Sequence, residues 1–333
     1  MNTIDQLITT VEIPRFDPKI RYRDPVAMFG SCFAEHISQK LYRYKYNVLT
    51  NPFGILYNPV SIARSIERIV HQQYYQADEL VLQDNLYHSM DHHGLYSGTN
   101  SEVVVSKINA SMKHAYEHLS NCAFVFISPG TSKVYTYKPS GAIVGNCHKI
   151  PQASFTYTQL TTKECEEAFE KIHSFIKKIS PTARIIWTVS PVRHLRDGLI
   201  ESQRSKSALI VALDQFLKHH PTSGYFPAYE IMMDQLRDYR YYARDMIHPS
   251  DIAVDIIWDL FSETYMDTHE RAYHPAIEKI KKAMEHRFLH DHRENIKTFA
   301  SGQLKNIDNL ATLLPDLYWQ QERQYFFHQL EMD

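Results

Sequence analysis

The sequence predicts an α/β fold in which a parallel β-sheet lies between two layers of helices. Short apolar or β-branched segments alternate along the chain with longer amphipathic ones, and a parallel sheet needs such crossover helices between its strands. The strands we expect are residues 26–30, 46–50, 122–128, 184–190 and 224–231. Because these segments are almost continuously apolar, both faces of the sheet should be buried, which gives a three-layer sandwich.

Helices are expected between the strands because apolar residues recur there at i, i+3 and i+4 spacing, as at Ile210, Leu213 and Leu217. The expected helices are residues 32–44, 60–73, 101–120, 161–179, 201–219 and 250–264. Residues 134–144 alternate between apolar and polar and contain Pro-Ser-Gly between two strand-like runs. This pattern predicts a β-hairpin inserted after the third strand, where it could serve as a flap.

The length of the chain predicts a large domain with an appendage. Its 333 residues exceed the about 250–300 at which a single core stops growing. After about residue 265 the chain becomes charged and rich in histidine. We therefore expect an α/β domain over residues 20–265 and a helical extension over 266–333. Residues 310–330 of this extension are amphipathic and aromatic-rich, so they should dock on the domain or on a second copy of the chain, forming a homo-oligomer.

Composition and charge exclude several classes of partner. Lys and Arg total 36 against 38 Asp and Glu, so no excess of positive charge marks the protein for nucleic acid or for an anionic membrane. The longest apolar runs are far shorter than the about 20 residues of a membrane-spanning helix, and the first residues lack the pattern of a secretory signal. The four cysteines form no Cys-x-x-Cys pair, which favours free thiols. We expect a cytoplasmic protein.

Ser31 lies at the junction between the first expected strand and the first expected helix. The strand ends in Met28-Phe29-Gly30, and the segment after Ser31 has helical periodicity. A hydroxyl at such a turn lies near the positive end of the helix dipole, where backbone N–H groups can stabilise an oxyanion. Ser31 is therefore a candidate nucleophile for acyl transfer. The alternative is an ordinary helix N-cap, a position that serine favours for structural reasons alone.

A candidate acid–base pair lies just before the last expected helix of the sheet region. Asp245 and His248 are three residues apart, and in a turn this spacing lets the carboxylate accept a hydrogen bond from the imidazole Nδ1–H. The other ring nitrogen, Nε2, then stays free to act as a general base toward a serine hydroxyl. A surface Asp–His pair explains an isolated match better, so this interpretation depends on Ser31.

Together these motifs resemble those of the SGNH, or GDSL-like, hydrolases, and within them the GSCFA-domain proteins. The resemblance covers roughly residues 20–265. The segments that carry it are Gly30-Ser31-Cys32-Phe33-Ala34, Asn51-Pro52-Phe53-Gly54, Leu56-Tyr57-Asn58-Pro59, Gly130-Thr131-Ser132-Lys133-Val134-Tyr135, Asn146-Cys147-His148-Lys149, Ser190-Pro191-Val192-Arg193-His194 and the Asp245/His248 pair. It implies a five-stranded parallel sheet of flavodoxin-like order and ester hydrolysis through an acyl-serine intermediate. It also implies the chain order Ser, Asp, His, which Ser31, Asp245 and His248 follow.

The resemblance further implies an oxyanion hole with three donors. These are the N–H of the nucleophile, a glycine N–H after the second strand and an asparagine side chain after the third. Ser31 and Gly54 match the first two, but Ser132 stands where the asparagine is expected. The side chains that could supply the third donor are Asn51, Asn146, Thr131 and Ser132. We favour Asn146, with the other three as candidate substrate-binding residues.

Further candidates for substrate binding follow the third and fourth strands. His148 comes after the hairpin, and Arg193 and His194 follow the fourth strand, so all three could reach the same edge of the sheet. A surface loop explains residues 146–149 as well, and a plain turn explains residues 51–54.

The sequence also offers a cysteine nucleophile and a metal site as rival chemistries. Cys32 would be the nucleophile if the helix N-terminus lowered the pKa of its thiol. The 19 histidines invite a metal site, but neither Asp91-His92-His93 nor the pair His286 and His290 fits a known ligand spacing with supporting carboxylates. We therefore expect no metal and no cofactor.

The leading prediction is a serine esterase in which Ser31 attacks the acyl carbonyl, His248 transfers the proton and Asp245 orients His248. Its substrate would be a small-molecule or carbohydrate ester, the latter by family analogy alone. The alternatives are an acyltransferase of the same fold, a non-catalytic sugar-binding module, and an assembly protein that binds partners through its tail.

Overall fold

A five-stranded parallel sheet forms the centre of the computed structural model, which describes residues 9–288 and 292–331. The strands lie in the order β10-β9-β5-β1-β2, which is 2-1-3-4-5 when they are counted along the chain. Their bounds are Val26–Gly30 (β1), Val48–Thr50 (β2), Phe124–Ser128 (β5), Arg184–Trp187 (β9) and Gly224–Tyr225 (β10). At the carboxyl edge Gly30 of β1 is in register with Ser128 of β5, so the residues after both strands meet there.

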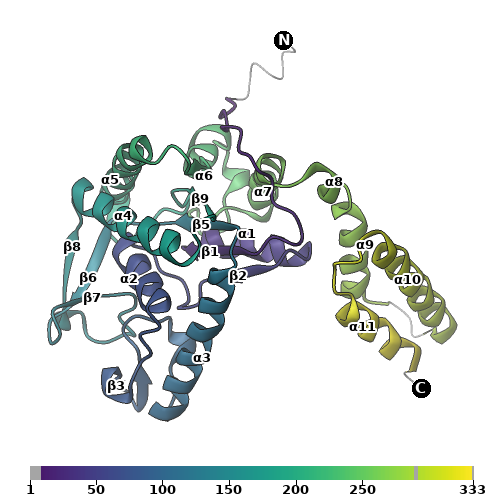
Figure 1. Ribbon diagram of the computed structural model, residues 1–333, viewed down its shortest axis with the longest axis horizontal. Helices are drawn as coiled ribbons and strands as arrows, with labels where there is room; N and C mark the ends of the chain where they lie inside the picture. The colour runs from purple at the N-terminus through teal and green to yellow at the C-terminus, as the bar shows by residue number, and fades with distance from the viewer. Residues whose placement is uncertain (1–8, 289–291, 332–333) are drawn as a thin grey trace.

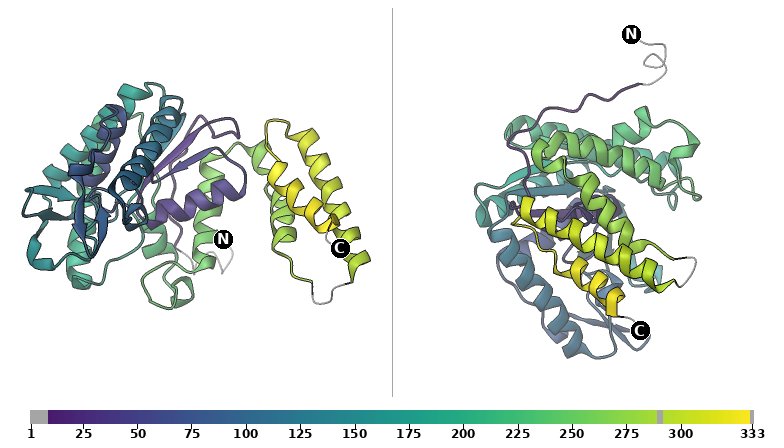
Figure 2. Two further views of the ribbon diagram at one scale, coloured as in Figure 1. Left: turned by 90° about the horizontal axis from the view of Figure 1, so that it is seen from below. Right: turned by 90° about the vertical axis from the view of Figure 1, so that its right-hand side faces the viewer.

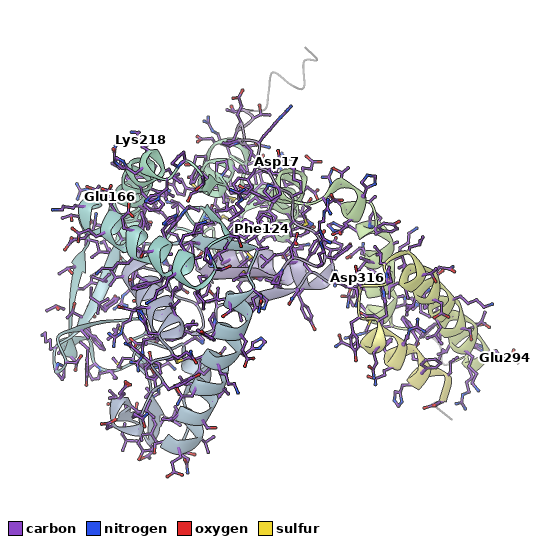
Figure 3. The ribbon with its side chains drawn as sticks, in the orientation of Figure 1. Asp17, Phe124, Glu166, Lys218, Glu294 and Asp316 are labelled. Atoms are coloured by element: carbon purple, nitrogen blue, oxygen red, sulfur yellow. The ribbon has the colours of Figure 1, made fainter. Side chains whose placement is uncertain are left out.

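Helices cover both faces of this sheet, as the sequence predicts (Figures 1 and 2). Successive residues of β1 and β5 point to opposite faces: Phe29 and Val125 pack against α2, α3, α4 and α5, whereas Met28 and Phe126 pack against α1 and α7. The bounds of the helices in this part of the chain are Cys32–Arg43 (α1), Pro59–Val70 (α2), Ser101–Ser120 (α3), Thr162–Ile179 (α4), Gly198–His219 (α5), Ala228–Glu230 (α6) and Asp251–Tyr265 (α7). Side chains fill the space between the layers, with Phe124 in the interior and Lys218 at the surface (Figure 3).

The fifth expected strand is the main error in the predicted elements. Residues 224–231 were expected to be extended, but β10 ends at Tyr225 and helical turns occupy residues 228–235. Pro227 explains the change, because it has no N–H to donate to a sheet and its fixed φ suits the start of a helix. Two short strands in the loop after α2, Val81–Gln83 (β3) and Leu86–His88 (β4), were not predicted.

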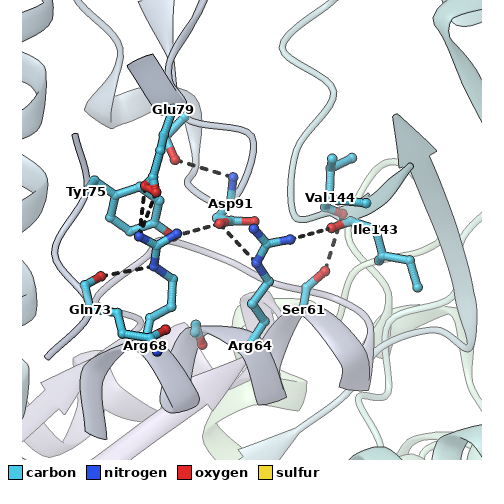
Figure 4. A network of polar contacts seen from close by, with 12 residues as sticks. Ser61, Arg64, Arg68, Gln73, Tyr75, Glu79, Asp91, Ile143 and Val144 are labelled. Atoms are coloured by element: carbon cyan, nitrogen blue, oxygen red, sulfur yellow. Dashed lines mark hydrogen bonds and ion pairs between the residues drawn. The ribbon is translucent and has the colours of Figure 1, made fainter. Parts of the chain in front are cut away.

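The predicted hairpin is present and belongs to a separate three-stranded antiparallel sheet. It consists of β6 (Lys133–Tyr137) and β7 (Ala142–Val144), and the unpredicted β8 (Phe155–Gln159) pairs with the other edge of β6. Two side chains of α2 hold β7 in place: Ser61 donates to the carbonyl of Val144 at 3.3 Å and Arg64 to that of Ile143 at 3.4 Å (Figure 4). Arg64 also pairs with Asp91 at 3.3 Å. The antiparallel sheet is therefore fixed against the α/β body.

The chain after α7 is helical, as predicted. It contains α8 (Thr268–Arg271), α9 (His274–Glu285), α10 (Arg293–Leu313) and α11 (Gln320–Glu331). Figures 1 and 2 show α9, α10 and α11 at one side of the α/β body. Within the described ranges no helix is long and apolar enough to cross a membrane.

Ion pairs and aromatic contacts attach these helices to α1 and to the residues that follow it. Arg43 pairs with Glu278 of α9 at 2.7 Å and with Glu285 at 2.6 Å. The buried Glu322 of α11 pairs with Lys45 at 2.7 Å, and Lys45 lies over the ring of Trp319. The aromatic tail thus docks on its own chain, one of the two arrangements that the sequence predicts; association with a second copy stays a prediction.

Candidate active site

Ser31 caps the N-terminus of α1 directly after β1. Its Oγ accepts a hydrogen bond from the N–H of Phe33 at 3.3 Å and shares another with the Oγ of Ser128 at 3.3 Å. The side chain is only 1% exposed. The capping role that the sequence allowed is therefore real, and it places the hydroxyl at the positive end of the helix and at the carboxyl edge of the sheet.

The Asp245–His248 pair has the geometry that its spacing predicts. Oδ1 of Asp245 accepts hydrogen bonds from the N–H groups of Ile247 and His248 at 2.9 and 3.0 Å, while Oδ2 lies 2.6 Å from Nδ1 of His248. These bonds lower the pKa of Asp245 to about 2, those from His248 contributing most. A carboxylate that is ionised at neutral pH fixes the proton on Nδ1, so Nε2 of His248 is the basic nitrogen.

Backbone pairing holds this turn just before α7. The N–H of Ala243 donates to the carbonyl of His248 at 2.8 Å, and that of Ser250 donates to the carbonyl of Tyr241 at 2.8 Å. Met246 adopts a left-handed conformation with φ of 59° at the tip of the turn. The two functional side chains therefore occupy a closed loop of defined shape.

His248 lies near two other imidazoles. Burial lowers the pKa of His36 in α1 and of His194 in the loop after β9, and His248 is close enough to lower both further. A Cβ added at Gly130 would lie 3.5 Å from Cβ of Ser31 and 3.6 Å from Nε2 of His194. Among the described residues Ser31 and His248 do not share a hydrogen bond, whereas Ser31 and His194 both lie next to Gly130.

His194 is nevertheless poorly suited to take a proton at neutral pH. Burial and the charge of Lys206 lower the pKa of His194 to about 4, and an efficient general base has a pKa near the working pH. Its ring packs edge-on against Tyr57 at 5.2 Å, and together these two rings flank Ser31 around Gly130. The sequence gives Tyr57 a place in a family motif but no role of its own.

Both backbone N–H groups expected in the oxyanion hole have partners in the structure. The N–H of Ser31 donates to the carbonyl of Ser128 at 3.0 Å, because the pairing of β1 with β5 continues one residue beyond the strand. The N–H of Gly54 donates to the carbonyl of Asn51 at 2.7 Å and closes a tight turn. Gly54 is required for that turn, since its φ is +79° and a Cβ would lie 2.2 Å from Cβ of His93.

The side-chain amide of Asn51 contains a buried donor without a partner. Its Oδ1 accepts a hydrogen bond from the N–H of Gly30 at 2.8 Å, which assigns the other end of the carboxamide as NH₂. That Nδ2 is buried and has no hydrogen-bond partner in the described part of the chain. A buried amide left unpaired beside the residue before Ser31 needs a functional or structural explanation.

A cavity of about 360 Å³ lies on the side of the site formed by Tyr57 and His194. Thr131 and Asn146, both predicted to bind substrate or oxyanion, line it as well, together with Tyr135 of the hairpin. The predicted flap thus forms one wall of the cavity. Oδ1 of Asn146 accepts a hydrogen bond from the N–H of His148 at 2.9 Å.

Besides Asn51, three predicted substrate-binding residues do not line this cavity. Ser132 is fully buried, and its hydroxyl donates to Ser205 of α5 at 3.1 Å. His148 bonds to the carbonyl of Ser89 at 2.7 Å and stacks on another histidine. Arg193 donates to the carbonyl of Leu199 at 3.2 Å and lines a separate open hollow. Each is oriented by a hydrogen bond that the sequence does not reveal, and those of Ser132 and His148 join residues far apart in the chain.

Cys32 does not have the lowered pKa that a thiolate nucleophile needs. Burial raises the pKa of its thiol, and this effect exceeds the opposing hydrogen bonds from its own backbone and from Tyr57. A protonated thiol is a weak nucleophile. The electrostatics of the site therefore favour Ser31.

Lys206 is a site residue that sequence reasoning missed. It is 1% exposed, and its Nζ donates to the carbonyl of Ser190, at the start of the loop that carries His194, at 2.5 Å. Burial lowers the pKa of Lys206 to about 7. A signal was present, because residue 206 falls in the apolar stripe of α5 with Leu209 and Leu213.

No group of three or more potential metal ligands is found among residues 9–288 and 292–331. Asp91 accepts from the hydroxyl of Tyr75 at 2.6 Å, and His92 stacks on Phe53 in the core. His290, the second member of the helical pair considered above, lies outside the described residues.

Two family models match the chain. The model described as the GSCFA family matches residues 25–261, which include Ser31, Asp245 and His248. The model described as the GSCFA domain protein, C-terminal domain, matches residues 277–332. No curated protein sequence matches the chain at a significant level.

Proposed function

The chain belongs to the GSCFA family, and from that premise and the geometry around Ser31 we propose that it is a serine hydrolase of the SGNH type acting on ester bonds. The observation that carries the proposal is the oriented Asp245–His248 pair, with its 2.6 Å hydrogen bond, at the same sheet edge as the Ser31 hydroxyl. Catalytic hydrogen bonds often form only in the substrate complex. Nε2 of His248 would therefore take the proton of Ser31 once substrate is bound.

In this mechanism Oγ of Ser31 bonds to the acyl carbon while its proton passes to His248. The oxyanion accepts a hydrogen bond from Nδ2 of Asn51, the unpaired donor, in place of the occupied N–H groups of Ser31 and Gly54. His248 returns the proton to the leaving alcohol as its C–O bond breaks. Water then resolves the acyl-serine by the same route, or a second alcohol does so in an acyltransferase.

One alternative is a non-catalytic binding module. It is favoured because the N–H groups of Ser31 and Gly54 already donate to backbone carbonyls and so are not free for an oxyanion. Hydrolysis of 4-nitrophenyl acetate and of acetylated sugars by the wild type, Ser31→Ala and His248→Ala separates the two. The esterase proposal predicts activity in the wild type alone, with His269→Ala, an exposed histidine of α8, as a fully active control. Binding of sugars by a folded wild type without any ester hydrolysis would contradict the proposal and support the module.

A further inference from the structure

A second and larger cavity has His248 in its lining. It is a groove of about 1000 Å³, the upper end of the about 300–1,000 Å³ range of ligand sites. One wall is α1, with Gln39 and Tyr42; another is formed by His248 and α7; the third is α9 of the C-terminal helices, with Lys281 and Glu285. The groove is thus shared between the α/β body and the C-terminal helices.

The charges of the groove are already compensated. Its three cations each have an anionic partner: Lys40 pairs with Asp255 at 2.5 Å, Arg43 with Glu278 at 2.7 Å and Lys281 with the buried Glu322 at 2.6 Å. No unpaired lysine or arginine therefore lines the groove in the part of the chain that the structure describes, and an anionic ligand has nothing to neutralise its charge.

The remaining surface suits a neutral ligand rich in hydroxyl groups. The ring of Tyr42 is 64% exposed, and the amide of Gln39 beside it is exposed as well. An exposed tyrosine offers an apolar face for the C–H side of a ring and a polar tip. The paired carboxylates keep acceptor lone pairs for hydroxyl donors.

The chemistry of the proposed reaction decides which half of the ester lies in the groove. When the acyl-serine forms, the C–O bond to the alcohol breaks and the alcohol oxygen receives the proton from Nε2 of His248. The leaving oxygen must therefore lie against His248, which lines the groove. The smaller cavity, lined by Tyr57, Thr131 and His194, remains for the acyl half.

We propose that the groove between α1, α7 and α9 binds the alcohol half of the substrate, a neutral molecule of several hydroxyl-rich units. The C-terminal helices are then part of the substrate site. This inference rests on the proposed esterase function for the identity of the ligand as the alcohol, but occupancy of the groove is measurable without catalysis.

The test is whether the full chain binds neutral hexasaccharides of glucose or xylose. Calorimetry measures the affinity, and hydrogen exchange locates the bound saccharide. Tyr42→Ala should weaken binding about three- to tenfold, the loss expected for one aromatic contact. Tyr318→Ala, at a tyrosine that is 70% exposed but does not line the groove, should leave binding unchanged. Bound saccharide should slow exchange in both α1 and α9, and hexagalacturonate should bind more weakly than the neutral saccharides.

The outcomes separate this inference from the proposed function. Both stand if the wild type hydrolyses 4-nitrophenyl acetate and binds the saccharides, Tyr42→Ala loses saccharide affinity, and Tyr318→Ala hydrolyses and binds as the wild type does. Saccharide binding with no ester hydrolysis by the wild type refutes the esterase and keeps the groove as a binding site. The groove assignment is refuted if no neutral saccharide binds at concentrations up to about 10 mM, which is beyond the millimolar limit of ordinary recognition. It is also refuted if the saccharide slows exchange only around Tyr57.

Discussion

Replacing Asn51 by aspartate tests the oxyanion donor with the smallest change in shape. The carboxylate keeps an acceptor for the N–H of Gly30, which Oδ1 of Asn51 binds at 2.8 Å, but it removes the unpaired Nδ2 donor. Loss of one such donor costs about 10²- to 10³-fold in kcat, or about 2.7–4 kcal/mol of transition-state stabilisation. We expect a loss of that size in Asn51→Asp, measured with 4-nitrophenyl acetate at a pH where the carboxylate is ionised.

Asn51→Ala should show the same loss of kcat with a different effect on stability. It leaves the buried N–H of Gly30 without an acceptor, which costs about 1–3 kcal/mol in the free energy of unfolding. Urea denaturation measures this term separately from turnover. Asn109→Asp is a matched control, because its amide donates to the carbonyl of Tyr75 at 3.0 Å, away from Ser31. A kcat of Asn51→Asp within about twofold of the wild type, far short of the loss of one donor, would refute the assignment.

Three further predictions concern the surroundings of Ser31. Cys32→Ala should keep ester hydrolysis, since burial raises the pKa of that thiol; complete loss of activity in this variant, with the fold intact by circular dichroism, would make Cys32 the nucleophile. Gly130→Ala should fold normally, because its added Cβ meets only ordinary contacts of 3.4–3.6 Å, yet lose activity by filling the space between Ser31 and His194; a fully active variant would place the substrate elsewhere. Between about pH 7 and 10.5 Lys206 binds fewer protons in the folded protein than in the unfolded chain. It therefore makes the free energy of unfolding rise with pH in this range, by up to about 1.4 kcal/mol per pH unit. Lys206→Met should remove this slope in denaturation curves recorded from pH 6 to 9, and identical slopes in both proteins would contradict the assignment.

The sequence predicts the parts of this molecule that depend on local patterns. The strand over residues 26–30 and the helix over 101–120 end where their apolar periodicity ends. The hydrogen bond between Asp245 and His248 follows from a spacing of three residues in a turn. Such features depend on neighbours in the chain, which the sequence displays directly.

The remaining features depend on residues that are distant in the chain. The N–H of Ser31 is occupied only because β1 is in register with β5, nearly a hundred residues later, and no local pattern specifies that register. The burial of Lys206 against the loop after β9 likewise requires the packed helix. Its position in the apolar stripe of α5 could have been noticed, whereas its partner, the carbonyl of Ser190, could not.

The central claim is that Ser31 is the nucleophile and His248 its base, and covalent labelling tests it most directly. The full-length wild type is treated with a fluorophosphonate, and the modified residue is identified by peptide mass mapping. We predict an adduct on Ser31 that forms about 10³-fold or more slowly in His248→Ala. An adduct on Cys32, or labelling of Ser31 at the same rate in His248→Ala, would contradict the account.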